Sequence, residues 1–169
     1  TAEQHMEGYE SGADAYIAKP FHTAHLKIRV RKMLEQAHKL HQFFKNENAT
    51  DALVEAGLPD SDRQFLCKLV NIIEEKMEEA EFNAEEIEKI LNLSKMQLYR
   101  KLKTLTGMTP GEFIKHIRLK RASNLLATTS LNVTEIFYRT GFNNQSYFFR
   151  EFRKRYNCAP NEYREQRTV

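Results

Sequence analysis

The C-terminal half of the chain contains the same pattern of residues twice, about 50 positions apart. The matching segments are 82–87 and 131–136, 98–103 and 148–153, and 109–113 and 159–163. The register slips once, between Ile87 and Leu98, so the second copy has one more residue in its turn. A solenoid needs at least three stacked units to close its core. The pattern therefore predicts a duplicated supersecondary unit inside one domain.

Positive charge is concentrated in the same half. The 169 residues carry a formal net charge of +3, but residues 1–80 hold 10 Lys and Arg against 14 Asp and Glu, whereas residues 81–169 hold 16 against 9. From Lys95 onward the count is 15 against 5, a net charge of +10. Such a region attracts polyanions, which include nucleic acid, anionic lipid and acidic proteins. Charge alone does not distinguish these partners.

The chain lacks the usual signatures of catalysis and metal binding. Cys67 and Cys158 lie far apart without a CxxC spacing, which is typical of free thiols in a reducing cytosol. Two histidine pairs have i,i+3 spacing, namely His22 with His25 and His38 with His41. No further ligands stand beside them, so we expect no metal and no cofactor. No GxSxG, HExxH or P-loop motif occurs, and we expect no enzymatic activity.

The first copy has the signals of two short helices joined by a turn. Asn83 with Glu86, and Ser94 with Gln97, have the spacing of capping boxes at two helix N-termini. Gly107 is placed to end the second helix at about Thr106. A helix, a turn of three or four residues and a second helix form a helix-turn-helix unit. We place this first unit at about 83–106.

The second helix of the first copy has one apolar and one mixed face. At 100° per residue Leu98, Leu102 and Leu105 fall together, and we expect this face to be buried. The opposite face carries Met96, Tyr99, Arg100 and Lys103. An exposed Met and Tyr beside two cations suit a DNA groove, where Arg pairs with guanine and apolar groups contact thymine methyls.

The second copy, at about 132–156, repeats this design. Asn132 and Glu135 cap its first helix, residues 141–143 form the turn, and its second helix runs from about Asn144 to Tyr156. Phe148 and Phe152 are expected to face inward. The expected outward residues are Gln145, Ser146, Phe149, Arg150 and Arg153. The equivalence of 99–100 and 149–150 favours a pair of recognition surfaces over a merely solvated basic face.

A longer helix is predicted between the copies, at about 110–127. Thr109 is the expected cap, Pro110 takes the first helical position and Glu112 completes a capping box. The apolar positions are Phe113, Ile114, Ile117, Leu125 and Leu126, and the expected outer positions are Arg118, Lys120 and Arg121. At 1.5 Å per residue this helix spans about 27 Å. With packing on either side, that length suits two recognition helices about 34 Å apart, one turn of DNA.

Residues 62–166 resemble the DNA-binding domain of the AraC family of bacterial transcription regulators. The resemblance rests on 98–107, Pro110, the 113–126 helix, 141–143, 147–148, 152–154 and 160–163, which stand in that family's order and spacing. It implies seven helices in two helix-turn-helix subdomains joined by one long helix. The base-contacting positions it implies are Lys95, Met96, Tyr99, Arg100, Asn144, Gln145, Phe149 and Arg150. Phe149 is large and apolar for such a position, and Glu151 places a negative charge beside Arg150.

Residues 10–21 resemble the last part of a response-regulator receiver domain, with a helix end, a turn, one buried strand and a Lys-Pro loop. The resemblance implies that Lys19 contacts the aspartyl phosphate and that the Lys19–Pro20 bond is cis. The helix that follows, from His25 to about Phe44, would be the final receiver helix. The phosphorylatable Asp and the acidic magnesium pair are expected upstream of Thr1, and we expect residues 1–24 to be poorly folded by themselves because a lone strand leaves its edges unpaired.

These observations predict a mainly α protein with a truncated α/β receiver remnant at its N-terminus. The expected divisions are a receiver fragment at 1–45, an acidic linker at 46–61 and a DNA-binding domain at 62–169 whose first helix is capped by Ser61 or Asp62. The predicted function is sequence-specific binding of duplex DNA by a cytoplasmic regulator under phosphorylation control. A homodimer of the parent protein, contact with RNA polymerase and a tether of the parent to the inner membrane are further expectations. The alternative is a non-specific anion-binding or dimerisation module, which salt and sequence dependence would distinguish.

Overall fold

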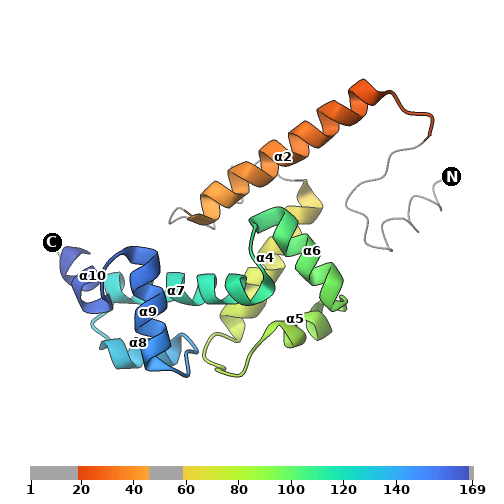
Figure 1. Cartoon of the computed structure of the whole chain (residues 1–169). Helices are drawn as coiled ribbons and strands as arrows, with labels where there is room; N and C mark the ends of the chain where they lie inside the picture. The colour runs from red at the N-terminus through yellow and green to blue at the C-terminus, as the bar shows by residue number, and fades with distance from the viewer. Residues whose placement is uncertain (1–18, 46–58, 168–169) are drawn as a thin grey trace. The chain divides into compact units, whose positions relative to one another are not determined.

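The computed structural model describes residues 19–45 and 59–167, and in these ranges the chain forms helices and turns without strands (Figure 1). The helices in chain order are α2 (Thr23–Lys45), α4 (Asp60–Glu75), α5 (Ala84–Leu91), α6 (Lys95–Thr106), α7 (Pro110–Thr128), α8 (Val133–Arg139), α9 (Gln145–Tyr156) and α10 (Pro160–Arg167). This confirms the prediction of a mainly helical protein. The predicted receiver strand and most of the predicted linker lie outside the described residues.

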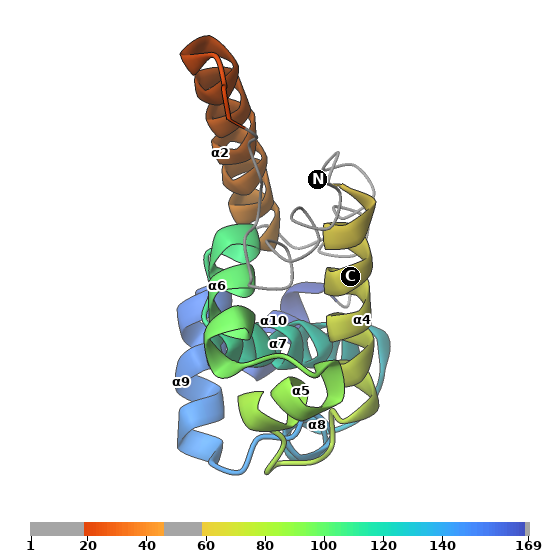
Figure 2. The ribbon, with the colours of Figure 1, turned by 90° about the vertical axis from the view of Figure 1, so that its right-hand side faces the viewer.

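The chain divides into two compact units. The α6 unit contains, among the described residues, 19–63 and 93–109, with α2 beside α6 (Figures 1 and 2). The α7 unit contains 64–92 and 110–167, in which α7 packs against α5, α8 and α10 and α10 also packs against α9. Each unit thus contains one of the two helices predicted to contact DNA.

Side-chain caps fix where the helices of both copies begin. Ser94 Oγ accepts a hydrogen bond from Gln97 N at 3.2 Å, and Gln97 Oε1 accepts one from Ser94 N at 2.9 Å. Asn132 and Glu135 form the same reciprocal pair, with both bonds at 2.8 Å. These boxes confirm the predicted starts of α6 and α8. Asn83 caps α5 through Glu85 N at 2.9 Å, not through the predicted box with Glu86.

Left-handed residues end several of the helices. Gly107 ends α6 with φ 73°, as predicted, while Asn92 ends α5 and Asn157 ends α9 with φ 52° and 58°. Gly and Asn enter this region more readily than other residues. The cis geometry of the Lys19–Pro20 peptide bond agrees with the expectation.

Aromatic packing forms the core around the second copy. Phe148 and Phe152 of α9 are fully buried and lie 5.8 Å apart between ring centroids. The buried cluster consists of Leu119, Ala122, Leu126, Ile136, Phe137, Phe142, Phe148, Phe152 and Tyr163. Burying one such aromatic ring contributes about 1.5–3 kcal/mol by transfer from water. The inward face predicted for α9 is therefore correct.

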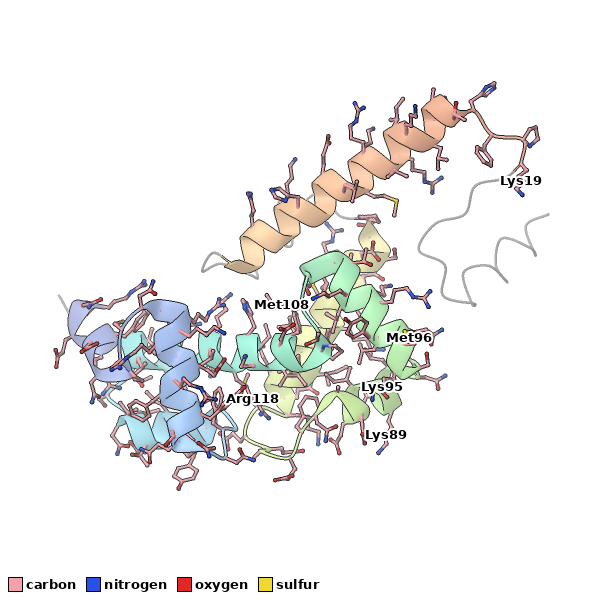
Figure 3. All side chains as sticks on the ribbon, viewed as in Figure 1. Lys19, Lys89, Lys95, Met96, Met108 and Arg118 are labelled. Atoms are coloured by element: carbon pink, nitrogen blue, oxygen red, sulfur yellow. The ribbon has the colours of Figure 1, made fainter. Side chains whose placement is uncertain are left out.

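Arg118 was expected on the outer side of α7, and this prediction is wrong. The side chain is buried, with 9% of the residue's surface exposed, and its Nη2 donates to the carbonyl oxygen of Glu79 at 2.8 Å. Figure 3 labels Arg118 on α7. The turn at Gly141 also packs here, because a Cβ on Gly141 would lie 2.1 Å from the carbonyl oxygen of Met77 and 3.0 Å from Arg118. A helix surrounded by neighbours buries its polar positions as well as its apolar ones.

The first helix of the predicted DNA-binding domain, α4, begins earlier than predicted. α4 begins at Asp60, whereas Ser61 or Asp62 was expected as its cap. The backbone N–H groups of Asp62 and Arg63 donate to the carbonyl oxygen of Pro59 at 3.0 and 3.1 Å, and the helix begins two to three residues before the starts that those caps imply. The apolar face of α4 is buried at Leu66, Leu69, Ile72 and Ile73.

Candidate nucleic-acid interface

The surface of α6 separates cleanly into a buried and an exposed face. Leu98 and Leu102 are fully buried and Leu105 is 9% exposed, as predicted. The predicted DNA-contacting residues are all exposed: Lys95, Met96, Tyr99, Arg100 and Lys103. Met96 is 63% and Tyr99 43% exposed. Figure 3 shows Lys95 and Met96 at the N-terminal end of α6 with their side chains directed away from it.

The charge of α6 is wholly positive. Its sequence carries Lys95, Arg100, Lys101 and Lys103 and no acidic residue. Lys101 lies on the flank of the helix, with its Nζ 3.5 Å from Asp62 Oδ1. The exposed cations stand beside the apolar Met96 and Tyr99, and this mixture provides both phosphate and base-edge contacts.

The second candidate surface lies on α9 and the residue before it. Asn144 is exposed and caps the helix by accepting from Tyr147 N at 2.8 Å. Gln145 and Ser146 occupy the exposed first turn, where a helix inserted in a major groove usually makes its base contacts. Arg150 and Arg153 are exposed one and two turns further along.

Phe149 differs from the prediction that it faces outward. It is partly buried and packs against the aromatic cluster, with its ring centroid 5.6 Å from that of Phe148. The exposed aromatic residue of α9 is Tyr147, at 36% exposed. The guanidinium carbon of Arg150 lies 5.2 Å from the centroid of the Tyr147 ring. The apolar Phe149 ring is stabilised by burial. This accounts for its packing on the core, while Tyr147 is the exposed aromatic residue of α9.

A charged pair joins α9 to α7. Lys115 Nζ lies 2.6 Å from Glu151 Oε2, and Arg150 Nε lies 3.6 Å from Glu151 Oε1. The hydrogen bond from Lys115 lowers the pKa of Glu151, although partial burial opposes the shift. Burial acts to lower the pKa of Lys115, but the hydrogen bond and charge of Glu151 with those of Tyr147 outweigh it and raise this pKa. The Glu151 carboxylate is therefore ionised and directed at α7 as well as at Arg150.

Further polar contacts hold the C-terminal half of α9 on α7. Arg155 Nη1 lies 2.9 Å from His116 Nδ1, and the Tyr156 hydroxyl donates to Ser123 Oγ at 3.0 Å. His116 is 4% exposed. Burial, followed by the charges of Arg155 and Lys120, lowers the pKa of His116 to about 3. The imidazole is thus neutral near pH 7 and accepts from the guanidinium.

Sequence reasoning missed the contacts that these supporting residues make. Lys115 and Glu151 are 36 positions apart, and His116 and Arg155 are 39 apart. No short motif links them. The available signals of such contacts would be a buried polar position on α7 and a cation on α9. Neither signal identifies the residue that it contacts.

The described part of the chain offers few other sites. Among residues 19–45 and 59–167 no group of three or more His, Cys, Asp or Glu side chains is placed to hold a metal ion. Cys67 and Cys158 are free thiols. None of the described helices combines the length and apolarity needed to cross a membrane.

Comparison with known proteins matches a helix-turn-helix domain model over residues 87–166. The chain is 37% identical over 162 residues to histidine kinase P4 of Formosa agariphila, covering 95% of this chain and 12% of that protein. It superposes on the C-terminal domain of the two-component response regulator yesN from Fusobacterium nucleatum with a TM-score of 0.54 at 31% identity, covering 60% of this chain and 98% of that domain.

A transcriptional regulator with an AraC-type DNA-binding domain from Chromobacterium violaceum gives a TM-score of 0.59 at 29% identity, covering 65% of this chain and 97% of that one. The two helix-turn-helix copies and these matches define the class: a DNA-binding domain of the helix-turn-helix type found in transcription regulators. The family model and the Chromobacterium violaceum structure support the AraC-type DNA-binding domain that the sequence resemblance predicted. The matched domain indicates no catalytic function.

Proposed function

We propose that this chain recognises specific sequences of duplex DNA through α6 and α9 and forms the output end of a two-component regulator. The observation that carries the proposal is the exposed face of α6. That face joins the cations Arg100 and Lys103 to the apolar Met96 and Tyr99, while the leucines of the same helix are buried. A merely solvated face gains nothing from exposed Met and Tyr, whereas a base-contacting face uses them.

The two recognition surfaces are assigned by residue. On the first, Lys95, Met96, Tyr99 and Arg100 contact bases and Lys103 contacts phosphate. On the second, the contacting residues are Asn144, Gln145, Ser146, Phe149, Arg150 and Arg153. Of these Phe149 contributes its exposed edge alone, because the ring packs on the core. Base contacts give specificity and phosphate contacts give register and affinity.

The proposed regulatory setting rests on the relatives. The kinase from Formosa agariphila matches nearly all of this chain, and the yesN domain belongs to a two-component response regulator. We assign residues 1–45 to the C-terminal part of a receiver, 46–61 to a linker and 62–169 to the output domain. Lys19 would then be the receiver lysine that contacts the aspartyl phosphate. In such a parent, homodimerisation, action on RNA polymerase and a tether to the inner membrane follow as further parts of the proposal, with this segment in the cytoplasm.

The test is selection of bound sequences from a random duplex pool at near-physiological salt. The wild-type chain is compared with a double variant, Arg100→Ala with Arg150→Ala. A recovered motif with two blocks about one turn apart, lost in the variant, is the expected result. Lys103→Ala serves as the matched control, because loss of a phosphate contact weakens binding evenly and lowers the salt slope by about 1 without changing the motif.

The alternative function, a non-specific anion binder, predicts a different result in the same experiment. Non-specific binding comes almost entirely from counterion release, so it depends steeply on salt and ignores sequence. No enrichment from the pool, with wild type and double variant binding alike, would replace the proposal by that alternative.

A further inference from the structure

The exposed aromatic side chain of α9 is Tyr147, a residue outside the predicted DNA-contacting set. Phe149 is the aromatic residue that the sequence assigns to base contact, but its ring packs on the core. Tyr147 lies two residues earlier and is 36% exposed. We propose that the ring of Tyr147 contacts the methyl group of a thymine in the base pair next to the one that Arg150 contacts. This inference rests on the proposed function and specifies part of the sequence that α9 recognises.

Tyr147 lies in the first turn of α9. It is the third residue of the helix, which begins at Gln145, and its backbone N–H donates to Asn144 Oδ1 at 2.8 Å. A recognition helix contacts base edges mainly through residues near its N-terminus. The position of Tyr147 therefore suits base contact better than that of Phe149, whose ring is also less accessible.

Exposure alone does not give a tyrosine a role in binding, because single exposed aromatic residues are ordinary on protein surfaces. Tyr138 of α8 is more exposed than Tyr147, at 65%. The two differ in their neighbours along the chain. Tyr147 stands between Ser146 and Arg150, two exposed residues of the second recognition surface, whereas Tyr138 belongs to the helix before the turn.

The ring of Tyr147 is held by three neighbours. Its centroid lies 6.3 Å from that of the Phe142 ring, 5.9 Å from Lys115 Nζ and 5.2 Å from the guanidinium carbon of Arg150. Glu151 contacts both cations and offsets part of their charge. A ring that is already ordered loses little conformational freedom when a ligand covers it.

The chemistry of the ring selects the base. The face of a tyrosine ring is apolar, and thymine is the base that presents an apolar methyl group in the major groove. Tyr147 and Arg150 are three residues apart, so they lie on the same side of the helix. Base pairs are stacked about 3.4 Å apart, a step that side chains one helical turn apart readily span. When Arg150 turns from the ring to a guanine, a thymine in the adjoining base pair falls within reach of Tyr147.

The test removes the methyl group from the DNA and leaves the protein unchanged. The motif recovered from the random pool is used, and the block recognised by α9 is the one whose selectivity Arg150→Ala relaxes. The thymine beside the guanine of that block is replaced by uracil, which pairs with adenine equally but lacks the methyl. Loss of one buried methyl group should weaken binding by wild type about fourfold. Fluorescence anisotropy at fixed salt measures the dissociation constants.

Four variants assign the methyl contact to a residue. Tyr147→Ala should bind the thymine and uracil duplexes equally, whereas Tyr147→Phe should keep the wild-type preference because it keeps the ring. Phe149→Leu should also keep the preference. Tyr138→Ala is the matched control for removal of an exposed tyrosine and should leave both dissociation constants unchanged. Circular dichroism checks that each variant retains its helix content.

Several results would overturn the inference. One is equal binding of the two duplexes by wild type, and another is an α9 block with no thymine beside its guanine. A preference that persists in Tyr147→Ala, or disappears in Phe149→Leu, would assign the methyl contact to another residue. An even loss on all sequences in Tyr147→Phe, with no effect of uracil, would indicate a phosphate contact through the hydroxyl.

Failure of this inference is distinguishable from failure of the proposed function. A recovered motif whose binding ignores the thymine methyl overturns the role of Tyr147 and leaves sequence recognition by α6 and α9 intact. Absence of any motif from the pool overturns both.

Discussion

The helices α6 and α9 occupy equivalent places in the repeated sequence pattern but present different surfaces. α6 exposes Tyr99 and the neighbouring Met96 without an acidic residue anywhere in the helix. α9 has buried Phe149 in part and carries Glu151, whose carboxylate lies 2.6 Å from Lys115 and 3.6 Å from Arg150. The two helices thus share one helical frame but differ in the chemistry of their exposed faces.

The difference shows that fixing a recognition helix on its scaffold can alter the groups available for binding. Polar contacts through Glu151, Arg155 and Tyr156 join α9 to α7. One of them places a carboxylate among the cations that would meet phosphate. We therefore expect α6 to contribute more sequence selectivity and α9 to respond more strongly to pH and to changes in its support.

The largest expected effect is a difference in stability between substitutions in the turns of the two copies. Gly141→Ala should lower the free energy of unfolding by about 3–4 kcal/mol, because φ is 71° and the new Cβ would meet the carbonyl oxygen of Met77 at 2.1 Å. Asn92→Ala, in the first turn at φ 52°, should cost about 1 kcal/mol since it adds conformational strain without that clash. Urea unfolding followed by circular dichroism measures both.

Gly111→Ala provides the control for glycine replacement itself. Apart from its chain neighbours and the backbone of its own helix, no atom lies within 4 Å of its added Cβ, and the residue is in the first turn of α7. Replacement there should stabilise the chain by up to about 1 kcal/mol. A Gly141→Ala variant as stable as Asn92→Ala would contradict the close packing of the second turn.

The next expected effect compares the two arginines at equivalent positions. Arg100→Ala should weaken binding to the selected DNA by about 1–3 kcal/mol and relax selectivity at one base pair, as for a bidentate contact with guanine. Arg150→Ala should cost less, because Arg150 must leave the Tyr147 ring and Glu151 to reach DNA. Dissociation constants for the selected sequence and its single-base variants, at fixed salt, measure the difference. Equal losses on every sequence would reject a base-contacting role for Arg100.

A third effect is the pH dependence of stability that comes from His116, the residue of α7 that contacts Arg155 of α9. The pKa of His116 falls to about 3 through burial and the charges of Arg155 and Lys120, so its protonation favours the unfolded chain. The corresponding stability is complete above the ordinary pKa of 6.5 and is lost as pH falls toward 3. Between pH 7 and pH 5 the free energy of unfolding should therefore drop by about 2 kcal/mol.

His116→Leu isolates this titration from that of the other histidines. The variant should be less stable at pH 7, because Arg155 loses its acceptor at 2.9 Å, but its stability should change little between pH 7 and pH 5. Urea unfolding at the two pH values gives the comparison. A wild-type slope retained in the variant would mean that His116 is not the titrating group.

The parts of this structure that the sequence predicted correctly are those set by neighbours in the chain. The boxes at Ser94 and Asn132 and the αL residue Gly107 depend on spacings of a few residues. The buried faces of α6 and α9 followed from periodicity of 3.6 residues. Arg118 and Phe149 were misplaced, because their burial depends on elements far away in sequence that a helical wheel does not include.

The same distinction applies to the candidate site. Exposure of the α6 face could be predicted because Met96, Tyr99 and Arg100 lie opposite three leucines. The contact between Lys115 and Glu151 could not, since it requires the packing of two helices whose residues are 36 positions apart. Which exposed side chains contact bases stays a prediction for the experiments on Arg100 and Arg150.

The smallest expected effect concerns the acidic residue that distinguishes α9 from α6. Glu151→Gln should lower the free energy of unfolding by about 1–2 kcal/mol, because a hydrogen bond to a charged group contributes about 1.5–3 kcal/mol and the Gln amide oxygen keeps part of it. The Lys115 hydrogen bond lowers the pKa of Glu151, so this contribution is present above the ordinary value of 4.5 and is lost as pH falls through the depressed pKa. The difference in stability between wild type and variant should therefore shrink as the pH is lowered below 4.5.

The same variant should strengthen DNA binding while it weakens the fold. Removal of the carboxylate beside Arg150 leaves the cations of α9 without an acidic neighbour at 3.6 Å, and affinity at low salt should rise on all sequences. Glu165→Gln, an exposed position on α10, makes the same change in net charge and should change affinity less. Equal gains in the two variants would show that net charge alone controls binding, and the chemical difference between α9 and α6 would then have no effect on DNA recognition.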